Sequence, residues 1–528
     1  MFDIVVRGGV LYDGTGAPPH RADLGIRGDS IEAIDRLEGV EAGRVIDATG
    51  LAVAPGFIDT HAHSDVMLLA EPEHAPKLRQ GVTTEVLGQD GMSFAPLSPA
   101  NLQHFRRYLA GAYGNPDIDW SWASVAEFRS RFDGTVAINT AYLVPHGTIR
   151  LEVLGMRDAP LVGPALREAQ ALVATGMEQG AAGLSTGLSY FPGSYSDTDE
   201  LVELCRTVAA RGGVYVSHIR TVFRGRPFDP VEEALEIGRR SGVAVHYSHF
   251  RTDPTTAGHV SELMAPIDAA RGAGMDVTLD VYPYPSGSGF GFTELPAWVH
   301  EGTVDEIKAR LSDPETRRRI FRDLQDQRAR RAGPPVESAY SHLPSPRNRE
   351  LIGLTFAEAA RQRGATADEL LCDLLVEEDL EVGRVQVPPT LDIWEQMDRD
   401  IMELFSRPYY TVGSDSIPVG ERPHPRAYGC FPRLLGRMRR QYGGISLEAL
   451  VNRGTLAAAE RFGLKDRGVL APGKAADVVV FDPATLCDRA TYDEPCAYPV
   501  GIEYVLVNGR VAVERGEPTG VLAGRAIP

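Results

Sequence analysis

Residues 55–63 read Pro-Gly-Phe-Ile-Asp-Thr-His-Ala-His, and this stretch does most to decide the fold. An apolar segment ends there in His61 and His63, which are two positions apart. Side chains at this spacing on an extended strand point to the same side, so both imidazoles can reach one metal ion. The stretch therefore predicts a strand that ends at a metal site, provided that further ligands follow along the chain.

Three later segments supply candidate ligands at the ends of apolar runs. His218 and His249 each follow such a run, in the similar sequences Ser-His-Ile-Arg and Ser-His-Phe-Arg. Either histidine alone would suit a packed core position, as we expect for His246, but two similar units on successive strands favour convergence. Asp415 closes a third run in the sequence Gly-Ser-Asp, where an aspartate can contact a metal and accept a proton from water.

The middle of the chain alternates short strands with helical segments. The apolar runs 214–216, 243–247 and 277–281 are preceded by amphipathic segments such as 200–211 and 230–241. Repeated βα units indicate a parallel sheet and the α/β class. Over residues 57–468 they favour a (β/α)8 TIM-like barrel, in which the carboxyl ends of the strands meet at the active site.

Both ends of the chain are rich in strands instead. Residues 1–56 and 469–528 alternate apolar and polar side chains between glycine-rich turns, and neither part is long enough for a β-core of its own. We therefore predict one small β-sandwich built from both chain ends. The glycine-, proline- and arginine-rich region at about 286–345 is predicted to be an insertion over the barrel mouth.

Composition limits the classes of partner. A formal net charge of −18 argues against nucleic acid or an anionic membrane as the partner. We expect no secretory signal and no membrane span, because no basic segment with a long apolar run opens the sequence and no stretch of about 18 apolar residues occurs. The five cysteines include no Cys-x-x-Cys pair, which predicts reduced thiols and a cytoplasmic location. Composition leaves the oligomeric state open.

Taken together, these motifs resemble the amidohydrolase superfamily. The resemblance rests on residues 55–63, the strand-end histidines, Asp415 and the closing segment 472–479. The finer stretches 81–96, 280–284 and 424–433 are similar to its D-aminoacylase branch. The resemblance implies a hydrolase that cleaves the amide bond of N-acyl-D-amino acids. It implies zinc at one tight site and leaves open a second, weaker one.

Two positions depart from the branch and bear on the site. Asp90 stands where the branch usually has cysteine, so it is either a harder oxygen ligand or the first residue of an Asp-Gly turn. Arg251 stands where the branch usually has lysine, and arginine still recognises a carboxylate. We therefore expect a small substrate that carries a carboxylate.

The resemblance also assigns roles to the remaining residues. The tight metal is expected at His218 and His249, with Asp90 if it is a ligand, while His61 and His63 form a second site or ligate the first weakly. Asp415 is expected to move the proton during catalysis. Arg251, Tyr282, Ser288, His146 and Tyr190 are the predicted substrate-binding residues, with Tyr282 or His146 as the donor to the oxyanion.

Lysine content separates this chain from close relatives of the branch. Hydantoinases and dihydroorotases bridge two metals with a carboxylated lysine on a middle strand. Only four lysines occur here: Lys77 and Lys308 lie in helical segments, and Lys465 and Lys474 lie near the end. Composition thus excludes such a bridge. The alternatives left open are a D-dipeptidase or a hydrolase of cyclic or carbamoyl amides in the same superfamily, and, as a different class, a non-catalytic scaffold.

Overall fold

A computed structural model describes residues 1–220, 229–330 and 336–528. Its centre is a sheet of eight parallel strands in the order β18-β14-β13-β12-β11-β10-β9-β8. The two outer strands approach each other, since the Thr60 N–H donates to the Val412 carbonyl at 3.1 Å, and the sheet thereby nearly closes into a barrel. The predicted (β/α)8 class is confirmed. The eight strands are β8 (Phe57–Asp59), β9 (Val82–Leu87), β10 (Asn139–Pro145), β11 (Gly183–Gly187), β12 (Val214–His218), β13 (Ala244–Tyr247), β14 (Val277–Val281) and β18 (Tyr410–Val412).

Helices cover the outside of the barrel, and their ends carry clear sequence signals. In α9 (Pro230–Ser241), the Asp229 side chain accepts the Val231 N–H, and acidic residues fill the first turn. The helix ends at Gly242, whose φ of 76° a glycine adopts without strain. The other main covering helices are α3 (Pro99–Tyr108), α5 (Val125–Ser130), α6 (His146–Leu154), α7 (Gly163–Glu178), α8 (Thr198–Ala209), α10 (Val260–Gly272), α15 (Leu391–Phe405), α18 (Leu447–Arg453) and α19 (Leu456–Phe462).

We call the line along which β8 and β18 meet the barrel seam. Several short helices follow the strands nearest this seam. The helices α1 (Met67–Ala70) and α2 (Ala75–Leu78) lie between β8 and β9, and α4 (Ala110–Tyr113) follows α3. After β18 come α16 (Arg426–Pro432), a π-helical turn (Arg433–Met438) and α17 (Arg439–Tyr442). Since α2 packs against α16, segments more than 300 residues apart meet beside the seam.

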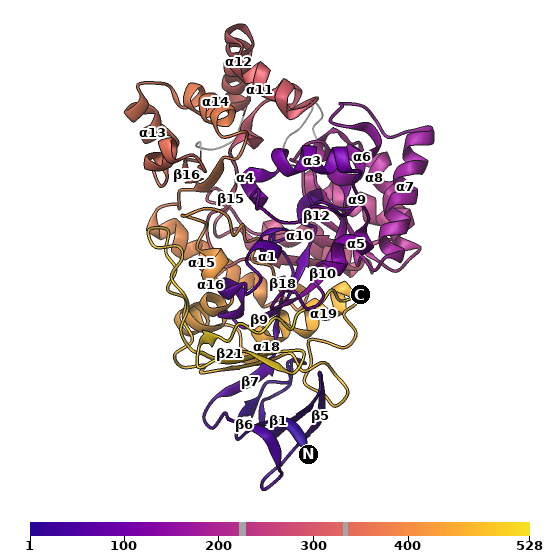
Figure 1. Ribbon diagram of the computed structural model, residues 1–528, viewed down its shortest axis with the longest axis vertical. Helices are drawn as coiled ribbons and strands as arrows, with labels where there is room; N and C mark the ends of the chain where they lie inside the picture. The colour runs from indigo at the N-terminus through magenta and orange to yellow at the C-terminus, as the bar shows by residue number, and fades with distance from the viewer. Residues whose placement is uncertain (221–228, 331–335) are drawn as a thin grey trace.

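The two chain ends share one sheet. Strands β2 (Val10–Leu11), β3 (His20–Arg21) and β7 (Ala52–Pro55) join β19 (Val478–Phe481), β20 (Ile502–Val507), β21 (Arg510–Glu514) and β22 (Glu517–Pro518). The second sheet consists of β1 (Phe2–Arg7), β4 (Asp23–Arg27), β5 (Ser30–Asp35) and β6 (Ala42–Asp47). One apolar core includes Ile4, Ile26, Val478 and Leu506, so residues from both ends are packed together. Figure 1 shows these strands below the barrel.

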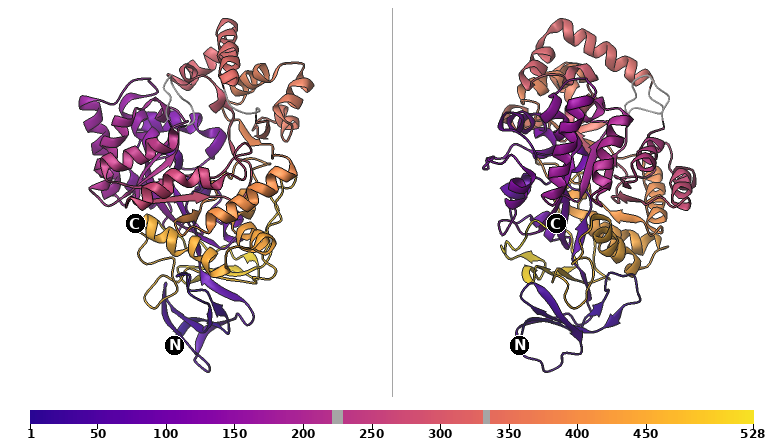
Figure 2. Two further views of the ribbon diagram at one scale, coloured as in Figure 1. Left: turned by 180° about the vertical axis from the view of Figure 1, so that it is seen from behind. Right: turned by 90° about the vertical axis from the view of Figure 1, so that its right-hand side faces the viewer.

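A further unit separates the seventh and eighth barrel strands. Its antiparallel sheet consists of β15 (Ser288–Phe290), β17 (Gly383–Gln386) and β16 (Ser338–His342), in that order. The helices α11 (Val304–Ser312), α12 (Pro314–Arg330), α13 (Phe356–Arg363) and α14 (Ala367–Glu377) complete it. Figures 1 and 2 place this unit at the end of the molecule opposite the chain-end sheets. Because β17 pairs with both other strands, the unit extends well past residue 345, where the sequence pattern ended it; residues 331–335 of the predicted insertion lie outside the described residues.

None of the described helices combines the length and the apolar character needed to cross a membrane.

Candidate metal centre and active site

The carboxyl ends of the barrel strands bring two groups of potential metal ligands together. His61, His63, Asp90 and Asp415 each offer a ligand atom within 4.8 Å of the others. Asp90, His218 and His249 form a second group at the same spacing. Asp90 belongs to both groups, so its carboxylate lies between two potential metal positions.

The backbone holds three of these residues in a conformation that side chains rarely adopt. Asp90, His249 and Asp415 have φ values of 55°, 37° and 50°. Non-glycine residues in the left-handed region cost about 1–3 kcal/mol each and persist only where neighbouring contacts enforce them. Here the His249 N–H donates to Asp280 Oδ1 at 2.7 Å, and the Asp415 N–H donates to the His61 carbonyl at 2.7 Å. Contacts made by the fold therefore fix the backbone conformation of these residues.

Hydrogen bonds fix the tautomer of His63. The Tyr113 hydroxyl donates to the Met92 carbonyl at 2.7 Å, which uses its only hydrogen. The same hydroxyl lies 2.8 Å from His63 Nδ1, so it must accept the N–H at that nitrogen. His63 Nε2 faces Asp415 Oδ1 at 3.2 Å, and in the neutral ring with its hydrogen on Nδ1 this nitrogen offers a lone pair to a metal. A metal at this position would meet a correctly oriented imidazole.

His218 and His249 face each other directly. Nδ1 of His218 and Nε2 of His249 are 2.9 Å apart, and the ring centroids are 4.7 Å apart. The ring of His61 lies 5.3 Å from that of His249. Histidines from three different strand ends thus converge on one small volume, which is the arrangement that the sequence predicted.

The electrostatics of the cluster fit a cation. Burial favours the neutral ring of His61, yet the carboxylates of Asp90, Asp280 and Asp415 outweigh it and raise its pKa to about 10. Both ring nitrogens of His61 and Oδ1 of Asp90 are buried without a hydrogen-bond partner. Orphaned donors and acceptors of this kind are costly unless something binds them. Four imidazoles with two carboxylates provide the nitrogen and oxygen ligands, and the charge, that suit one or two zinc ions.

Asp415 stays ionised within this group. Burial opposes its charge, but Arg426 and the neighbouring histidines hold the pKa of Asp415 well below its usual range. Arg426 Nη1 lies 2.8 Å from Asp415 Oδ2, while Asp415 Oδ1 faces His61 and His63. One carboxylate oxygen is thus held by the guanidinium, and the other is directed at the imidazoles.

A second group of side chains beside the ligands can recognise a carboxylate. Two guanidinium groups lie over the ring of Tyr282, that of Arg251 at 4.9 Å and that of Arg426 at 4.4 Å from its centroid. Arg251 Nη2 donates to the Tyr282 hydroxyl at 3.2 Å, and Arg426 Nη2 donates to Ser288 Oγ at 3.0 Å. The structure therefore brings Arg251, Tyr282 and Ser288 together next to Asp415.

The two remaining predicted substrate contacts differ in position. The ring of Tyr190 lies 4.8 Å from that of His218 and stacks on Phe290 of β15 at 5.7 Å, so it lines the site. His146 lies apart from this group: its Nε2 is 2.7 Å from Glu200 Oε1, and the residue is fully buried. Its Nδ1 is buried without a hydrogen-bond partner, and the substrate-binding role of His146 stays a prediction.

Three contributors were not assigned roles from the sequence. Arg426 and Asp280 occur within the stretches 424–433 and 280–284, which were used only as markers of the branch, although a strand-end aspartate such as Asp280 is a recognisable signal. Tyr113 lies on the four-residue helix α4, and nothing in the local sequence marks it. Its role depends on a contact over 50 residues.

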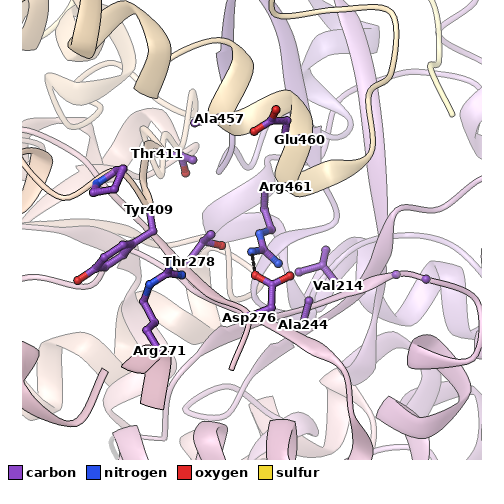
Figure 3. Close-up of a pocket in the computed structure, with 13 residues that line it drawn as sticks. Val214, Ala244, Arg271, Asp276, Thr278, Tyr409, Thr411, Ala457, Glu460 and Arg461 are labelled. Atoms are coloured by element: carbon purple, nitrogen blue, oxygen red, sulfur yellow. Dashed lines mark hydrogen bonds and ion pairs between the residues drawn. The ribbon is translucent and has the colours of Figure 1, made fainter. Parts of the chain in front are cut away.

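The opposite end of the barrel contains a cavity of about 430 Å³. Figure 3 shows its lining, which includes Arg271, Asp276, Thr278 and Arg461 near the amino ends of the strands. In a (β/α)8 barrel this end contributes stability while catalysis occurs at the other. We therefore assign the active site to the mouth with the histidines.

Comparison with known proteins agrees with this geometry. The Amidohydrolase family matches residues 44–211 and 352–513. The chain is similar to an N-acyl-D-glutamate deacylase of Alcaligenes xylosoxydans xylosoxydans, at 37% identity over 98% of this chain and 95% of that protein. It is also similar to a D-aminoacylase of the same organism, at 35% identity over 100% and 97%.

The chain belongs to the amidohydrolase family, in its D-aminoacylase branch.

A solved structure extends the likeness of this amidohydrolase to three dimensions. The N-acyl-D-glutamate deacylase of Bordetella bronchiseptica, complexed with zinc and a phosphonate inhibitor that mimics the tetrahedral intermediate, has a TM-score of 0.82. It is 34% identical, and the match covers 100% of this amidohydrolase and 99% of that chain. The resemblance inferred from motifs therefore holds over the whole chain.

Proposed function

We propose that this amidohydrolase cleaves the amide bond of N-acyl-D-amino acids in a zinc-dependent reaction and releases a carboxylic acid and a D-amino acid. The observation that carries the proposal is that two ligand groups sharing Asp90 adjoin Asp415 and a carboxylate-binding group. The D configuration of the substrate is supported by the relatives at 37% and 35% identity.

Zinc fits the residues present. His218, His249 and Asp90 would hold one ion, and His61 and His63 would hold a second beside Asp90 and Asp415. When bound, the ion polarises the acyl carbonyl and lowers the pKa of water. Asp90 would contribute to both positions, because it belongs to both ligand groups.

Asp415 moves the proton in the proposed reaction. Its ionised carboxylate can take a proton from the attacking water through Oδ1, because Oδ2 is held by Arg426. The same residue can then deliver that proton to the leaving nitrogen. Arg426 orients the carboxyl group during both transfers, and it favours the ionised form before the first transfer and after the second.

Arg251 and Tyr282 position the substrate. A carboxylate attached to the carbon that bears the amide nitrogen would pair with Arg251, and the Tyr282 hydroxyl would complete the contact. Tyr190 is placed to contact the substrate side chain, since it bridges His218 and the insertion strand β15. Binding at two points fixes the amide bond relative to Asp415.

The test is turnover by the zinc-loaded enzyme. We expect hydrolysis of N-acetyl-D-methionine or N-acetyl-D-glutamate and much slower hydrolysis of the L enantiomers. A D-dipeptide and a hydantoin, assayed in parallel, test the two alternative hydrolase activities, and preferential turnover of either would replace the proposal. A purified protein without bound metal and without turnover would support the alternative that the chain is a non-catalytic scaffold.

We further propose that the protein works in a reducing compartment, because all five cysteines are free thiols and three are buried.

A further inference from the structure

A second buried cluster of charged side chains lies behind the metal centre, where β8 and β18 meet. We call it the seam cluster, and it consists of Asp59, His74, Lys77, Glu85 and Ser414. The side chain of Lys77 is 1% exposed, and those of Asp59 and Glu85 are fully buried. A buried lysine is rare, and this chain has only four lysines in all. The proposed reaction does not use it.

The ammonium group of Lys77 joins three partners. It donates to Asp59 Oδ2 in a very short contact, to Glu85 Oε1 at 2.9 Å and to Ser414 Oγ at 2.8 Å. These account for its three hydrogens. Lys77 itself lies on α2, outside the barrel wall, so one side chain from the helix layer connects β8, β9 and the loop after β18.

Asp59 links Lys77 to the two loops that carry His61 and Asp415. Its Oδ1 accepts the Ser414 N–H at 2.8 Å and the His61 N–H at 3.2 Å. Its Oδ2 accepts the Ser414 hydroxyl at 2.5 Å. One carboxylate thus holds the backbone of both strand ends, two residues before His63 on one side and one residue before Asp415 on the other.

Side-chain contacts matter at the seam because β8 and β18, as described, are not joined by a regular series of backbone hydrogen bonds. They are the two outer strands in the order of the sheet. Backbone contacts between them include Thr60 N–H to the Val412 carbonyl at 3.1 Å and His63 N–H to the Ser416 carbonyl at 3.0 Å. Asp415 follows directly with its left-handed φ of 50°, a conformation that depends on its surroundings.

The charged side chains of the seam cluster stabilise each other's ionised forms. Burial disfavours the charged form of Lys77, but the carboxylates of Asp59 and Glu85 outweigh it and raise the pKa of the amine above its ordinary value. Burial likewise opposes the charge of Glu85, yet Lys77 and His74 lower its pKa to about 2. Removing one member of a buried charge pair leaves the other uncompensated, which is strongly destabilising. Any test must therefore separate positioning from charge balance.

We propose that Lys77 is a positioning residue of this amidohydrolase: it holds Asp59 and Ser414, and through them it fixes the two loops that present His61 and Asp415. The inference rests on the proposed function of those residues. Among the described residues, the polar contacts of Lys77 are with the seam cluster and not with a ligand side chain. Its effect is therefore transmitted through the backbone.

The experiment compares K77M with the double variant K77M/E85Q. K77M should lower both the melting temperature and kcat. K77M leaves Asp59 and Glu85 without the ammonium group. The double variant also neutralises position 85, and Asp59 keeps three hydrogen-bond donors, so this variant should recover most of the melting temperature. Its kcat should stay about 10- to 100-fold below that of the wild type, because a small displacement of reacting groups costs this much, while KM changes little. Recovery of kcat together with stability would show that Lys77 only balances charge, and would overturn the proposal.

A spectroscopic readout tests the same point without turnover. In cobalt(II)-substituted protein, the visible bands report the geometry of the ligands. We expect altered bands in K77M/E85Q and unaltered bands in the matched control K308M, since Lys308 pairs with the half-exposed Asp379 in the insertion. Identical bands in K77M/E85Q and the wild type would contradict the proposal.

A milder variant covers the case in which the lysine variants do not fold. S414A keeps all the charges and removes only the hydroxyl that joins Lys77 to Asp59. It should lower kcat and alter the cobalt bands, and wild-type values of both would reject the positioning role. Failure of the proposed function is a separate result: wild-type enzyme inactive on N-acyl-D-amino acids would refute that function, while the cobalt spectra would still test Lys77.

Discussion

The two ends of the barrel are built from the same strands and differ in the type and the exposure of their polar side chains. At the mouth, imidazoles and carboxylates are buried, and several of their polar atoms have no partner. At the bottom, the pair between Arg461 and Asp276 reaches solvent, because the Asp276 side chain is 64% exposed. An apolar core that includes Ile58, Val86 and Phe462 belongs to the barrel as well. At the mouth, the left-handed backbone of Asp90, His249 and Asp415 and the unpaired atoms of His61 occur together, and packing elsewhere offsets their cost.

One polar path connects the two ends. Thr278 lines the bottom cavity, and its hydroxyl lies 2.7 Å from His246 Nδ1. His246 Nε2 is 3.0 Å from Asp280 Oδ2, and Asp280 also holds the backbone of His249. His246 is thus a packed residue, as predicted, and a link to the ligands. Substitutions at each end test whether the bottom of the barrel affects catalysis at the mouth.

The largest effect is expected for Asp415→Asn at the mouth. The amide cannot accept the proton, so kcat should fall by about 10²- to 10⁴-fold, the range typical for loss of a general acid–base group. Steady-state kinetics of the zinc-loaded variant give the measurement, with zinc content determined in the same sample. A kcat near that of the wild type would rule out the proton-transfer role.

Loss of a ligand should come next. In His218→Ala we expect the zinc affinity to fall by more than about 10-fold, because even residues that only support metal ligands contribute that much. Competition with a chelator measures the affinity, and metal analysis gives the stoichiometry. His259→Ala is the matched control, since its side chain is 64% exposed at the start of α10. Equal zinc affinities in the two variants would remove His218 from the site.

A smaller effect is expected where the substrate carboxylate binds. Arg251→Met should raise KM by about 10- to 100-fold, which corresponds to about 1.5–3 kcal/mol for a charged hydrogen bond, and kcat should change less. Arg251→Lys keeps the charge and should recover part of the binding. If KM for N-acyl-D-amino acids stayed constant in both variants, the carboxylate would have to bind elsewhere, with Arg426 the next candidate.

The smallest effect is expected at the bottom of the barrel. Arg461→Met removes a pair whose carboxylate is 64% exposed, and the methionine can pack in the nearly buried place of the arginine side chain, which is 8% exposed. The free energy of unfolding should therefore fall by only about 1 kcal/mol. Urea denaturation measures this change, and kcat/KM should remain near the wild-type value. A large loss of kcat/KM would instead show that the bottom cavity acts on the mouth through Thr278, His246 and Asp280.

Sequence patterns predicted the residues whose roles depend on their own strand. His61, His63, His218, His249 and Asp415 each end an apolar run, and parallel strands in a barrel must bring such ends together. The sequence could not place His146 in the same way, since its strand also ends at the mouth while its side chain turns to Glu200. Nor could it give the extent of the insertion, because β17 pairs with strands far from it in sequence.

The amino-acid sequence alone determined the barrel, the ligand types and the absence of a bridging lysine, because periodicity, strand ends and composition are local properties. Only the tertiary structure decided that Asp90 lies in both ligand groups, that Arg426 holds Asp415, and that Lys77 fastens the seam. These contacts join residues as far apart as Lys77 and Ser414, 337 positions along the chain. No local pattern encodes such a distance, since it results from closing the whole barrel.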